Sequence, residues 1–269
     1  MKPPPFEYHV PESLEEALAL KAELRDDASI LAGGQSLLPL LNMRFARPPA
    51  LIDLNRIREL AYVEERNGGI AVGAMTRQRA LERSEDAARL CPLVGETLLQ
   101  VAHSIVRNRG TVGGSIAHAD PAAELPALLC ALGGKVTVRG PRGAREIPAE
   151  AFFHFYFSTS LEPDEILTEV WFPSLPPGAG YAFLELSRRH GDFALCGVAC
   201  VVTEEALRLG FSGVGSRPIT VDSDDPASIN EAVDPTDDIH ATAHYRRKLA
   251  VVLARRAVAI ARGRMGGAR

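Results

Sequence analysis

Two glycine pairs carry the residue types that a chain needs to bind a phosphate group. The first lies in Leu31-Ala32-Gly33-Gly34-Gln35-Ser36 and the second in Thr111-Val112-Gly113-Gly114-Ser115. Each pair follows a short apolar run and precedes a small hydroxyl residue. Because glycine has no Cβ, it lets backbone N–H groups come close to an anion. A single pair is more typical of a tight turn, but we interpret both as phosphate cradles.

The residues around these pairs resemble a known family. After the second pair, Ile116 to Leu129 has the pattern of a polar loop that runs into an apolar helix. Taken in order, the segments 32–45, 51–57 and 106–129 resemble the FAD-binding medium subunit of the molybdenum hydroxylases, the group that contains carbon monoxide dehydrogenase and the xanthine dehydrogenases. The resemblance starts at Phe6-Glu7-Tyr8 and continues to the C-terminal helix with Tyr245-Arg246, so it covers nearly the whole chain.

The resemblance implies which residues contact FAD. It places Ala32, Gly33, Gly34, Gln35 and Ser36 around the pyrophosphate and the ribityl chain, Thr111, Gly113, Gly114 and Ser115 on the opposite side, and adds Leu31 and Ala102 to the set. Glu124 matches an acidic residue near the flavin imide, and Leu167 matches an apolar contact beside the ring. Two simpler interpretations stay open: Glu124 as a carboxylate at the positive end of a helix, and Leu167 as a core residue.

The chain departs from the family pattern at two positions. Gln35 stands where some relatives have His, which preserves hydrogen bonding but removes a titratable group. Glu185 stands at or next to a position where the family often has Lys, and a carboxylate there would disfavour negative charge on the flavin. We therefore expect either that Arg188 supplies the missing cation or that the flavin has a lower reduction potential than in relatives.

Several other polar residues have no single predicted role. His118 and Asp120 either contact the adenosine side of the cofactor or cap the turn before Pro121. His240 and His244 are spaced so that they could face a metal from one helix, but no third ligand is apparent, and we predict no metal site. We also predict no catalytic residue in this chain, because the cofactor would supply the chemistry.

Composition limits the class of protein. The 269 residues have a net charge of −4 and a pI near 6.0, and 46% of them are hydrophobic. These values are typical of a globular protein with a sizeable core and argue against nucleic acid as a partner. No run approaches the roughly eighteen apolar residues of a transmembrane span, and Met1-Lys2-Pro3-Pro4-Pro5 is unlike a signal peptide. The expected location is the cytoplasm.

The cysteines indicate where iron–sulfur clusters would be held. Cys91, Cys130, Cys196 and Cys200 show no Cys-x-x-Cys spacing and have the pattern of small core residues in a reduced compartment. An iron–sulfur cluster needs about four thiolates. If electrons reach a flavin here through such clusters, another polypeptide must carry them.

The order of elements predicts an α+β fold in three parts. The expected parts are two lobes of a PCMH-type FAD-binding domain at 1–55 and 56–177, and a small C-terminal domain of antiparallel strands and a helix at 178–269. A capping box at Ser13 and Glu16 begins the first helix, within a β-α-β pattern. Thr76 is expected to cap a helix, and further helices are expected at 93–103, 121–132 and 237–264, with a glycine loop at 107–115.

The resemblance implies an electron-transfer subunit of a molybdopterin-dependent hydroxylase or dehydrogenase. A small partner subunit would hold 2Fe–2S clusters and a large one the molybdopterin, in a dimer of heterotrimers, and electrons would pass through FAD to NAD+, a quinone or another acceptor. Two alternatives stay open: a self-sufficient FAD-dependent oxidase or reductase, and a non-catalytic assembly protein. A Rossmann site is set aside because no G-x-G-x-x-G lies between a strand and a helix.

Overall fold

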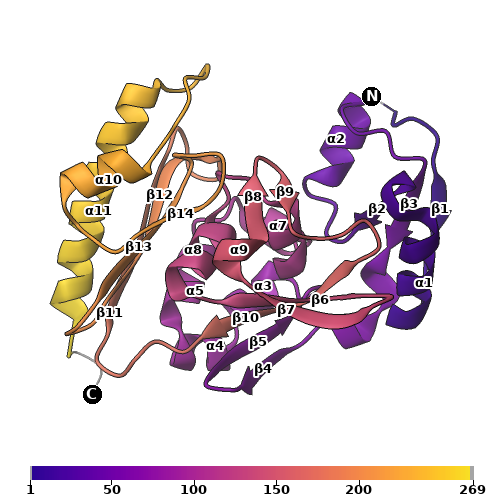
Figure 1. The fold of residues 1–269 in the computed structure, drawn as a ribbon, viewed down its shortest axis with the longest axis horizontal. Helices are drawn as coiled ribbons and strands as arrows, with labels where there is room; N and C mark the ends of the chain where they lie inside the picture. Colours follow the sequence, from indigo (N-terminus) through magenta and orange to yellow (C-terminus); the bar gives the residue numbers. More distant parts are fainter. Residues whose placement is uncertain (1, 267–269) are drawn as a thin grey trace.

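The computed structural model describes residues 2–266, which form three parts in a row (Figure 1). The N-terminal part lies at one end and the C-terminal part at the other, with a five-stranded sheet and its helices between them. Helices and largely antiparallel sheets occur together in the chain, which confirms the α+β prediction. No helix within residues 2–266 is long and apolar enough to cross a bilayer.

The N-terminal part is built on a three-stranded sheet in the order β1-β3-β2, in which both outer strands run parallel to β3. Its elements are β1 (Glu7–His9), α1 (Leu14–Leu24), β2 (Ala28–Leu31), α2 (Leu37–Met43) and β3 (Ala50–Asp53). Ser13 Oγ accepts the Glu16 N–H at 3.2 Å and caps α1, as predicted. The parallel pairing of β2 with β3 across α2 confirms the β-α-β pattern.

The middle part contains an antiparallel sheet in the order β4-β5-β10-β6-β7. Its strands are β4 (Val63–Arg66), β5 (Gly69–Gly73), β6 (Lys135–Gly140), β7 (Gly143–Pro148) and β10 (Ile166–Pro173), with a small hairpin of β8 (Phe153–Phe155) and β9 (Ser158–Thr159) beside it. The helices are α3 (Gln78–Glu82), α4 (Glu85–Leu90), α5 (Pro92–Leu98), α6 (Ser104–Arg107), α7 (Val112–His118), α8 (Glu124–Leu132) and α9 (Ala149–Phe152). The central strand β10 joins the two hairpins into one sheet.

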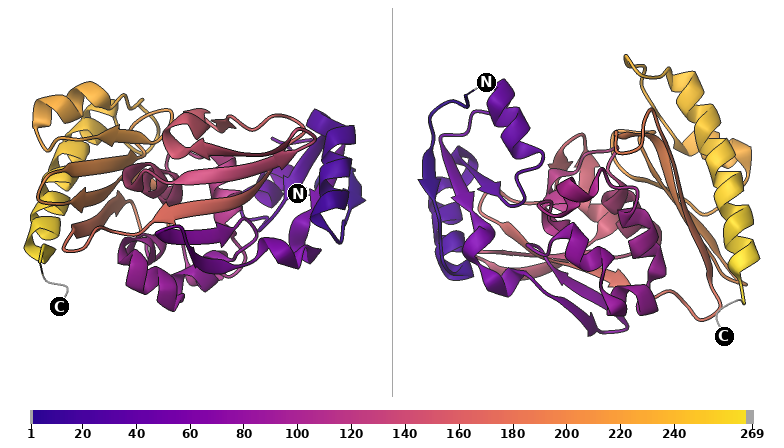
Figure 2. Two further views of the ribbon diagram at one scale, coloured as in Figure 1. Left: turned by 60° about the horizontal axis from the view of Figure 1, so that its bottom comes forward. Right: turned by 180° about the vertical axis from the view of Figure 1, so that it is seen from behind.

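The C-terminal part is an antiparallel sheet in the order β11-β12-β13-β14. Its elements are β11 (Gly180–Ser187), β12 (Ala194–Val202), β13 (Leu207–Ser212), β14 (Ile219–Val221), α10 (Pro226–Ala232) and α11 (Ala243–Arg264). The long helix α11 lies along the outer face of the sheet (Figure 2), and α8 of the middle part packs against β12 and β13. The sheet is therefore buried on both faces, and β12 is an almost continuous run of buried residues.

Several predicted helix boundaries are wrong. Thr76 does not cap a helix, because its hydroxyl donates to Tyr62 O at 2.8 Å and α3 begins only at Gln78. The helices expected at 93–103, 121–132 and 237–264 run instead over Pro92–Leu98, Glu124–Leu132 and Ala243–Arg264. The last one begins late because Thr242 caps it, accepting the Tyr245 N–H on its side chain.

Three clusters of buried hydrophobic residues follow the three parts of the chain. The clusters also reach across both predicted boundaries: Met75 and Ile166 pack in the N-terminal cluster, and Phe183 and Ala199 in the middle one. Shared buried residues of this kind couple neighbouring parts mechanically. The division of the chain into domains at 1–55, 56–177 and 178–269 therefore stays a prediction.

Candidate functional site

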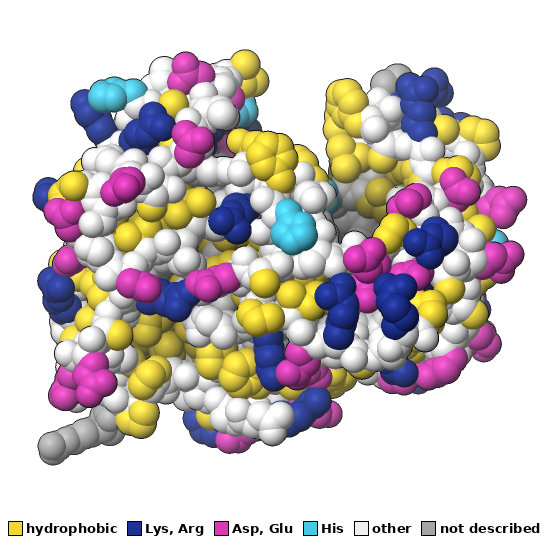
Figure 3. Space-filling model, viewed as in Figure 1, with side chains coloured by type: hydrophobic (Ala, Val, Ile, Leu, Met, Phe, Trp, Pro, Cys, Tyr) yellow, Lys and Arg dark blue, Asp and Glu magenta, His cyan; other side chains and the backbone are white. Residues whose placement is uncertain are grey.

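A cavity of about 670 Å³ lies where the N-terminal part faces the middle part. Figure 3 shows the surface hollowed between the lobe that carries α2 and the rest of the molecule. All but one of the residues predicted to contact the cofactor line this cavity: Ala32, Gly33, Gly34, Gln35, Ser36, Ala102, Thr111, Gly113, Gly114, Ser115, Glu124 and Leu167. The exception is Leu31, the last residue of β2, which pairs with Asp53.

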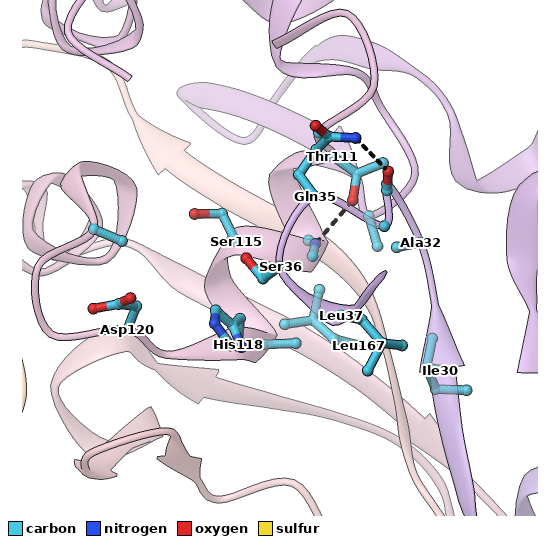
Figure 4. Close-up of a pocket in the computed structure, with 18 of the residues that line it drawn as sticks. Ile30, Ala32, Gln35, Ser36, Leu37, Thr111, Ser115, His118, Asp120 and Leu167 are labelled. Atoms are coloured by element: carbon cyan, nitrogen blue, oxygen red, sulfur yellow. Dashed lines mark hydrogen bonds between the residues drawn. The ribbon is translucent and has the colours of Figure 1, made fainter. Parts of the chain in front are cut away.

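The loop at 32–36 carries a row of backbone donors. Among the described residues, no backbone hydrogen bond takes up the N–H groups of Gly33, Gly34, Gln35 and Ser36. Gly34 has a φ of +72°, a left-handed conformation that glycine adopts without strain. The Gln35 side chain folds back over this loop, and its Nε2 donates to Gly33 O at 3.1 Å (Figure 4). The first glycine pair therefore lies in a loop with donors free for an anion.

The second glycine pair lies in the first turn of α7, where the sequence was expected to form a loop. Thr111 caps this helix, because its Oγ1 accepts the Gly114 N–H at 3.1 Å (Figure 4). The N–H groups of Val112 and Gly113 also have protein partners, and that of Gly113 donates to Ala74 O at 2.9 Å. The N–H groups of this pair are therefore not free donors, because Thr111 Oγ1 and the carbonyl oxygen of Ala74 already accept them, and contact between this pair and the cofactor stays a prediction.

Asn55 and Arg77 join the first loop to the segment before α7, and the sequence did not single them out. Asn55 Nδ2 donates to Ala32 O at 2.8 Å, and the Arg77 guanidinium donates to Asn55 Oδ1 and to Arg109 O. Asn55 lies in the segment 51–57 that carried part of the family resemblance, so a signal for it was present. No pattern pointed to Arg77, because its two acceptors lie far from it in the chain.

Glu124 and Leu167 occupy the inner wall of the cavity. Glu124 is the first residue of α8, as the simpler interpretation expects, and it also lines the cavity with only 8% of its surface exposed. Burial raises the pKa of Glu124 to about 7; the charge of Asp120 acts in the same direction and that of Arg107 opposes it. Leu167 is a buried residue of β10 whose side chain contributes to the core and to the cavity.

His118 and Asp120 also line the cavity (Figure 4). Asp120 Oδ1 accepts the Ala122 N–H at 2.9 Å, so this residue does cap the turn before α8. The His118 ring lies 5.0 Å from the Phe157 ring, centroid to centroid, and burial lowers the pKa of His118. Both residues line the cavity, so the capping role of Asp120 is compatible with a contact to a ligand.

The loop between β11 and β12 forms another edge of the cavity through Gly191, Asp192 and Phe193, which the sequence did not indicate. Arg188 forms an ion pair with Asp192 at 3.3 Å. Neither Arg188 nor Glu185 lines the cavity. The hypothesis that one of these two side chains sets the charge beside the flavin by direct contact therefore has no support in the geometry.

The histidine pair near the C-terminus does not share a helix face. His240 is an exposed residue of the bend before α11, and His244 lies in the first turn of that helix. Within residues 2–266, no group of three or more His, Cys, Asp or Glu side chains is arranged to hold a metal ion.

Comparison with known proteins places the chain in a family. The family model that matches residues 4–175 describes the FAD binding domain in molybdopterin dehydrogenase. The alpha subunit of the 6-hydroxypseudooxynicotine dehydrogenase complex of Paenarthrobacter nicotinovorans is 42% identical, over 96% of this chain and 95% of the relative. The medium chain of carbon monoxide dehydrogenase from Hydrogenophaga pseudoflava is 37% identical, over 96% of this chain and 97% of the relative.

The fold agrees with this assignment. A solved structure of carbon monoxide dehydrogenase from Hydrogenophaga pseudoflava, in a form that lacks the Mo-pyranopterin moiety of the molybdenum cofactor, matches with a TM-score of 0.95 at 35% identity. The match covers 99% of this chain and 100% of the chain in that structure. The chain therefore belongs to the family of FAD-binding domains of the molybdopterin dehydrogenases, and it is an oxidoreductase subunit with FAD as its cofactor.

Proposed function

We propose that this chain is the electron-transfer subunit of a molybdopterin-dependent hydroxylase or dehydrogenase. The observation that carries the proposal is the cavity itself, in which the free N–H groups of the loop at 32–36 lie in one wall and Leu167 and Glu124 in another. Its volume of about 670 Å³ lies within the range of about 300–1,000 Å³ that is typical of ligand sites.

The donors and acceptors in this cavity fit the chemistry of FAD. The phosphates would accept the N–H groups of Gly33, Gly34 and Ser36, and the hydroxyl of Ser115 would add a further donor. The flat ring would lie against Leu167. Glu124 would face the imide edge, where its carboxyl group donates a hydrogen bond when protonated and accepts one when ionised.

The residues of the chain position and tune the cofactor instead of reacting themselves. When bound, FAD supplies the capacity to take up single electrons and to release them in pairs. Asn55 and Arg77 hold the two cofactor-facing segments at a fixed spacing, and the buried carboxyl of Glu124 sets the charge at the inner wall. No side chain of the cavity is required as a nucleophile or as a general base.

The electrons would come from partner subunits. We infer a small subunit with 2Fe–2S clusters, a large subunit with the molybdopterin, and a dimer of such heterotrimers in the cytoplasm; NAD+, a quinone or another molecule would be the final acceptor. The names of the relatives, one a subunit of a dehydrogenase complex and one a medium chain, support an assembly of unlike subunits. The substrate would be bound by the molybdopterin subunit, outside this chain.

Affinity purification of the full chain from its native cells, followed by an absorption spectrum, tests the proposal. We expect flavin bands together with iron–sulfur absorption, and one small and one large chain that co-purify. A single yellow polypeptide would instead favour a self-sufficient flavoenzyme. A colourless chain whose melting temperature does not respond to added FAD would overturn the assignment of the cavity.

A further inference from the structure

A buried polar layer lies behind the inner wall of the cavity, between α8 and the C-terminal sheet. The strand β13 packs so closely on α8 that a Cβ on Gly210 would lie 2.4 Å from Ala127 O. Two residues further along β13, on the same face of the sheet, is Ser212, and about one turn earlier along α8 is Glu124. The packing therefore brings Ser212 to the side of α8 on which the cavity-lining carboxyl of Glu124 lies.

Glu185 belongs to the same layer. Glu185, Gly197 and Ser212 lie side by side across β11, β12 and β13. Gly197 has no side chain, and its neighbours occupy the place that a side chain would take. A Cβ there would lie 2.5 Å from Ser212 Oγ and 3.8 Å from Glu185 Oε2. Glycine at this position therefore allows the hydroxyl and the carboxyl group to occupy one face of the sheet together.

The hydroxyl of Ser212 and one carboxyl oxygen of Glu185, the two polar groups next to Gly197, lack hydrogen-bond partners within residues 2–266. Ser212 is fully buried, and neither its Oγ nor Glu185 Oε2 has a partner among the described residues. Buried polar atoms without partners are rare, because each loses its hydrogen bonds to water and gains none in the protein. A bound proton, which turns an ionised carboxylate into a neutral acid with a donor of its own, lowers this cost for Glu185 and gives Ser212 a potential partner.

Among the described residues, no cation lowers the pKa of Glu185, and only Arg107 lowers that of Glu124 by its charge. Burial raises the pKa of Glu185 to about 8, and the neighbouring Glu124 acts in the same direction. The other charged or titratable groups that act on the pair are Asp120 and Arg107, both on Glu124, and Cys196, whose own pKa is raised chiefly by burial. Glu96 of α5 also faces β11, but it is bound to the Phe183 N–H and to Arg264.

We propose that Glu124, Ser212 and Glu185 form a proton reservoir behind the cavity, which takes up a proton when negative charge is added in the cavity and releases it when that charge leaves. This inference rests on the proposed function, because the added charge would be electrons that reach FAD from the iron–sulfur clusters of a partner subunit. Glu185 is only partly buried, so it is the end of the layer that exchanges protons with solvent. Glu124 is the end that faces the cavity.

The proposed step conserves charge and atoms. Two electrons raise the negative charge in the cavity, and a carboxylate of the layer takes up a proton from solvent to become a carboxylic acid. When the electrons pass to the acceptor, the carboxylic acid returns its proton to solvent. Within the layer, only the O–H bond of a carboxyl group forms or breaks.

Proton counting on the FAD-loaded full chain tests this. The chain is reduced electrochemically in weak buffer with a pH indicator, between pH 6 and pH 9. Near pH 7 to 8 we expect the wild type to take up more protons per two electrons than Glu185→Gln, by up to about one proton. Proton uptake by Ser212→Ala should lie between these two values. Glu204→Gln removes an exposed carboxylate on the β12–β13 turn and should take up as many protons as the wild type. Equal uptake by the wild type and Glu185→Gln would overturn the inference.

A second measurement needs no cofactor and therefore separates this inference from the proposed function. The infrared spectrum of the full chain without FAD should contain a carbonyl band of protonated carboxyl groups at pH 6 that is lost by pH 9 and is weaker in Glu185→Gln, in which only Glu124 of the layer can carry a proton. If FAD does not bind, the proposed function fails, and the same spectrum still decides whether the layer holds a proton. If Glu185→Gln does not fold, a wild-type spectrum without this band at pH 6 contradicts the reservoir.

Discussion

The backbone of Gly33 lies against that of Gly110: a Cβ on Gly33 would come within 2.8 Å of the Gly110 Cα and 2.4 Å of the Arg109 carbonyl oxygen. The loop with free N–H groups therefore touches the segment that leads into α7. This contact gives Gly33 a reason to be glycine that does not depend on a ligand, because any side chain would push two cavity walls apart.

Gly33→Ala should therefore affect the fold as well as FAD. Since the nearest atoms are backbone atoms that cannot rotate away, we expect a loss of about 1–3 kcal/mol in the free energy of unfolding and at least a tenfold weaker affinity for FAD. Urea denaturation and fluorescence titration with FAD measure the two quantities. Gly95→Ala is the control: it lies in α5 with open space around it, so helix propensity should stabilise the chain by about 0.5–1 kcal/mol. A Gly33→Ala variant as stable as the wild type would contradict the contact.

Arg77→Met should weaken FAD binding through the spacing of the two walls. The variant loses the hydrogen bonds to Asn55 Oδ1 and Arg109 O, and we expect FAD to bind about tenfold more weakly, since the loss of a hydrogen bond to a charged donor costs about 1.5–3 kcal/mol. Titration calorimetry gives the dissociation constant. Arg83→Met removes an exposed arginine that forms no ion pair in the described structure, and it should bind FAD like the wild type. If both variants bound FAD equally well, the hydrogen bonds of Arg77 to Asn55 and Arg109 would have no role in FAD binding.

Thr111→Val should destabilise α7 and the cofactor site together. Without Thr111 Oγ1 the Gly114 N–H loses its acceptor, which should cost about 1 kcal/mol of folding free energy and should weaken FAD binding several-fold. Thr242→Val removes an equivalent cap from α11. We expect Thr242→Val to show a similar loss in thermal stability with an unchanged FAD affinity, because α11 does not contribute to the cavity. Equal FAD affinities in the two variants would show that the α7 cap does not shape the site.

The stability of the chain should decrease as the pH rises towards 9. The folded-state pKa values of Glu124 and Glu185, about 7 and about 8, lie above the ordinary value of 4.5. Stabilisation by their protonated forms is therefore fully present below pH 4.5 and is lost as the pH rises through 7 to 8, at about 1.4 kcal/mol for each unit of pKa shift. Urea denaturation at pH 6 and pH 9 measures this difference. It should be smaller in Glu185→Gln and unchanged in Glu204→Gln; an equal difference in all three proteins would contradict the assignment.

Local sequence patterns were sufficient for much of the fold. The cap at Ser13, the β-α-β pattern and the antiparallel C-terminal sheet were predicted because they depend on residues that are close in sequence and on apolar periodicity. The boundaries that failed, at Thr76 and near the starts of α8 and α11, depend on which group accepts or donates a hydrogen bond. Thr76 resembles a cap in sequence, but its hydroxyl donates instead to the carbonyl oxygen of Tyr62, just before β4.

The sequence by itself determined the cofactor family, and all but one of the residues that it predicted as cofactor contacts line the cavity, because the two glycine segments keep their order and types along the chain. Only the tertiary structure decided how those residues act. It showed that the N–H groups after Gly33 are free whereas those of Gly113 and Gly114 are satisfied by Ala74 and Thr111. It also moved Glu185 from the expected flavin edge to a buried layer behind Glu124. Both outcomes depend on contacts between segments far apart in the chain, which no local pattern specifies.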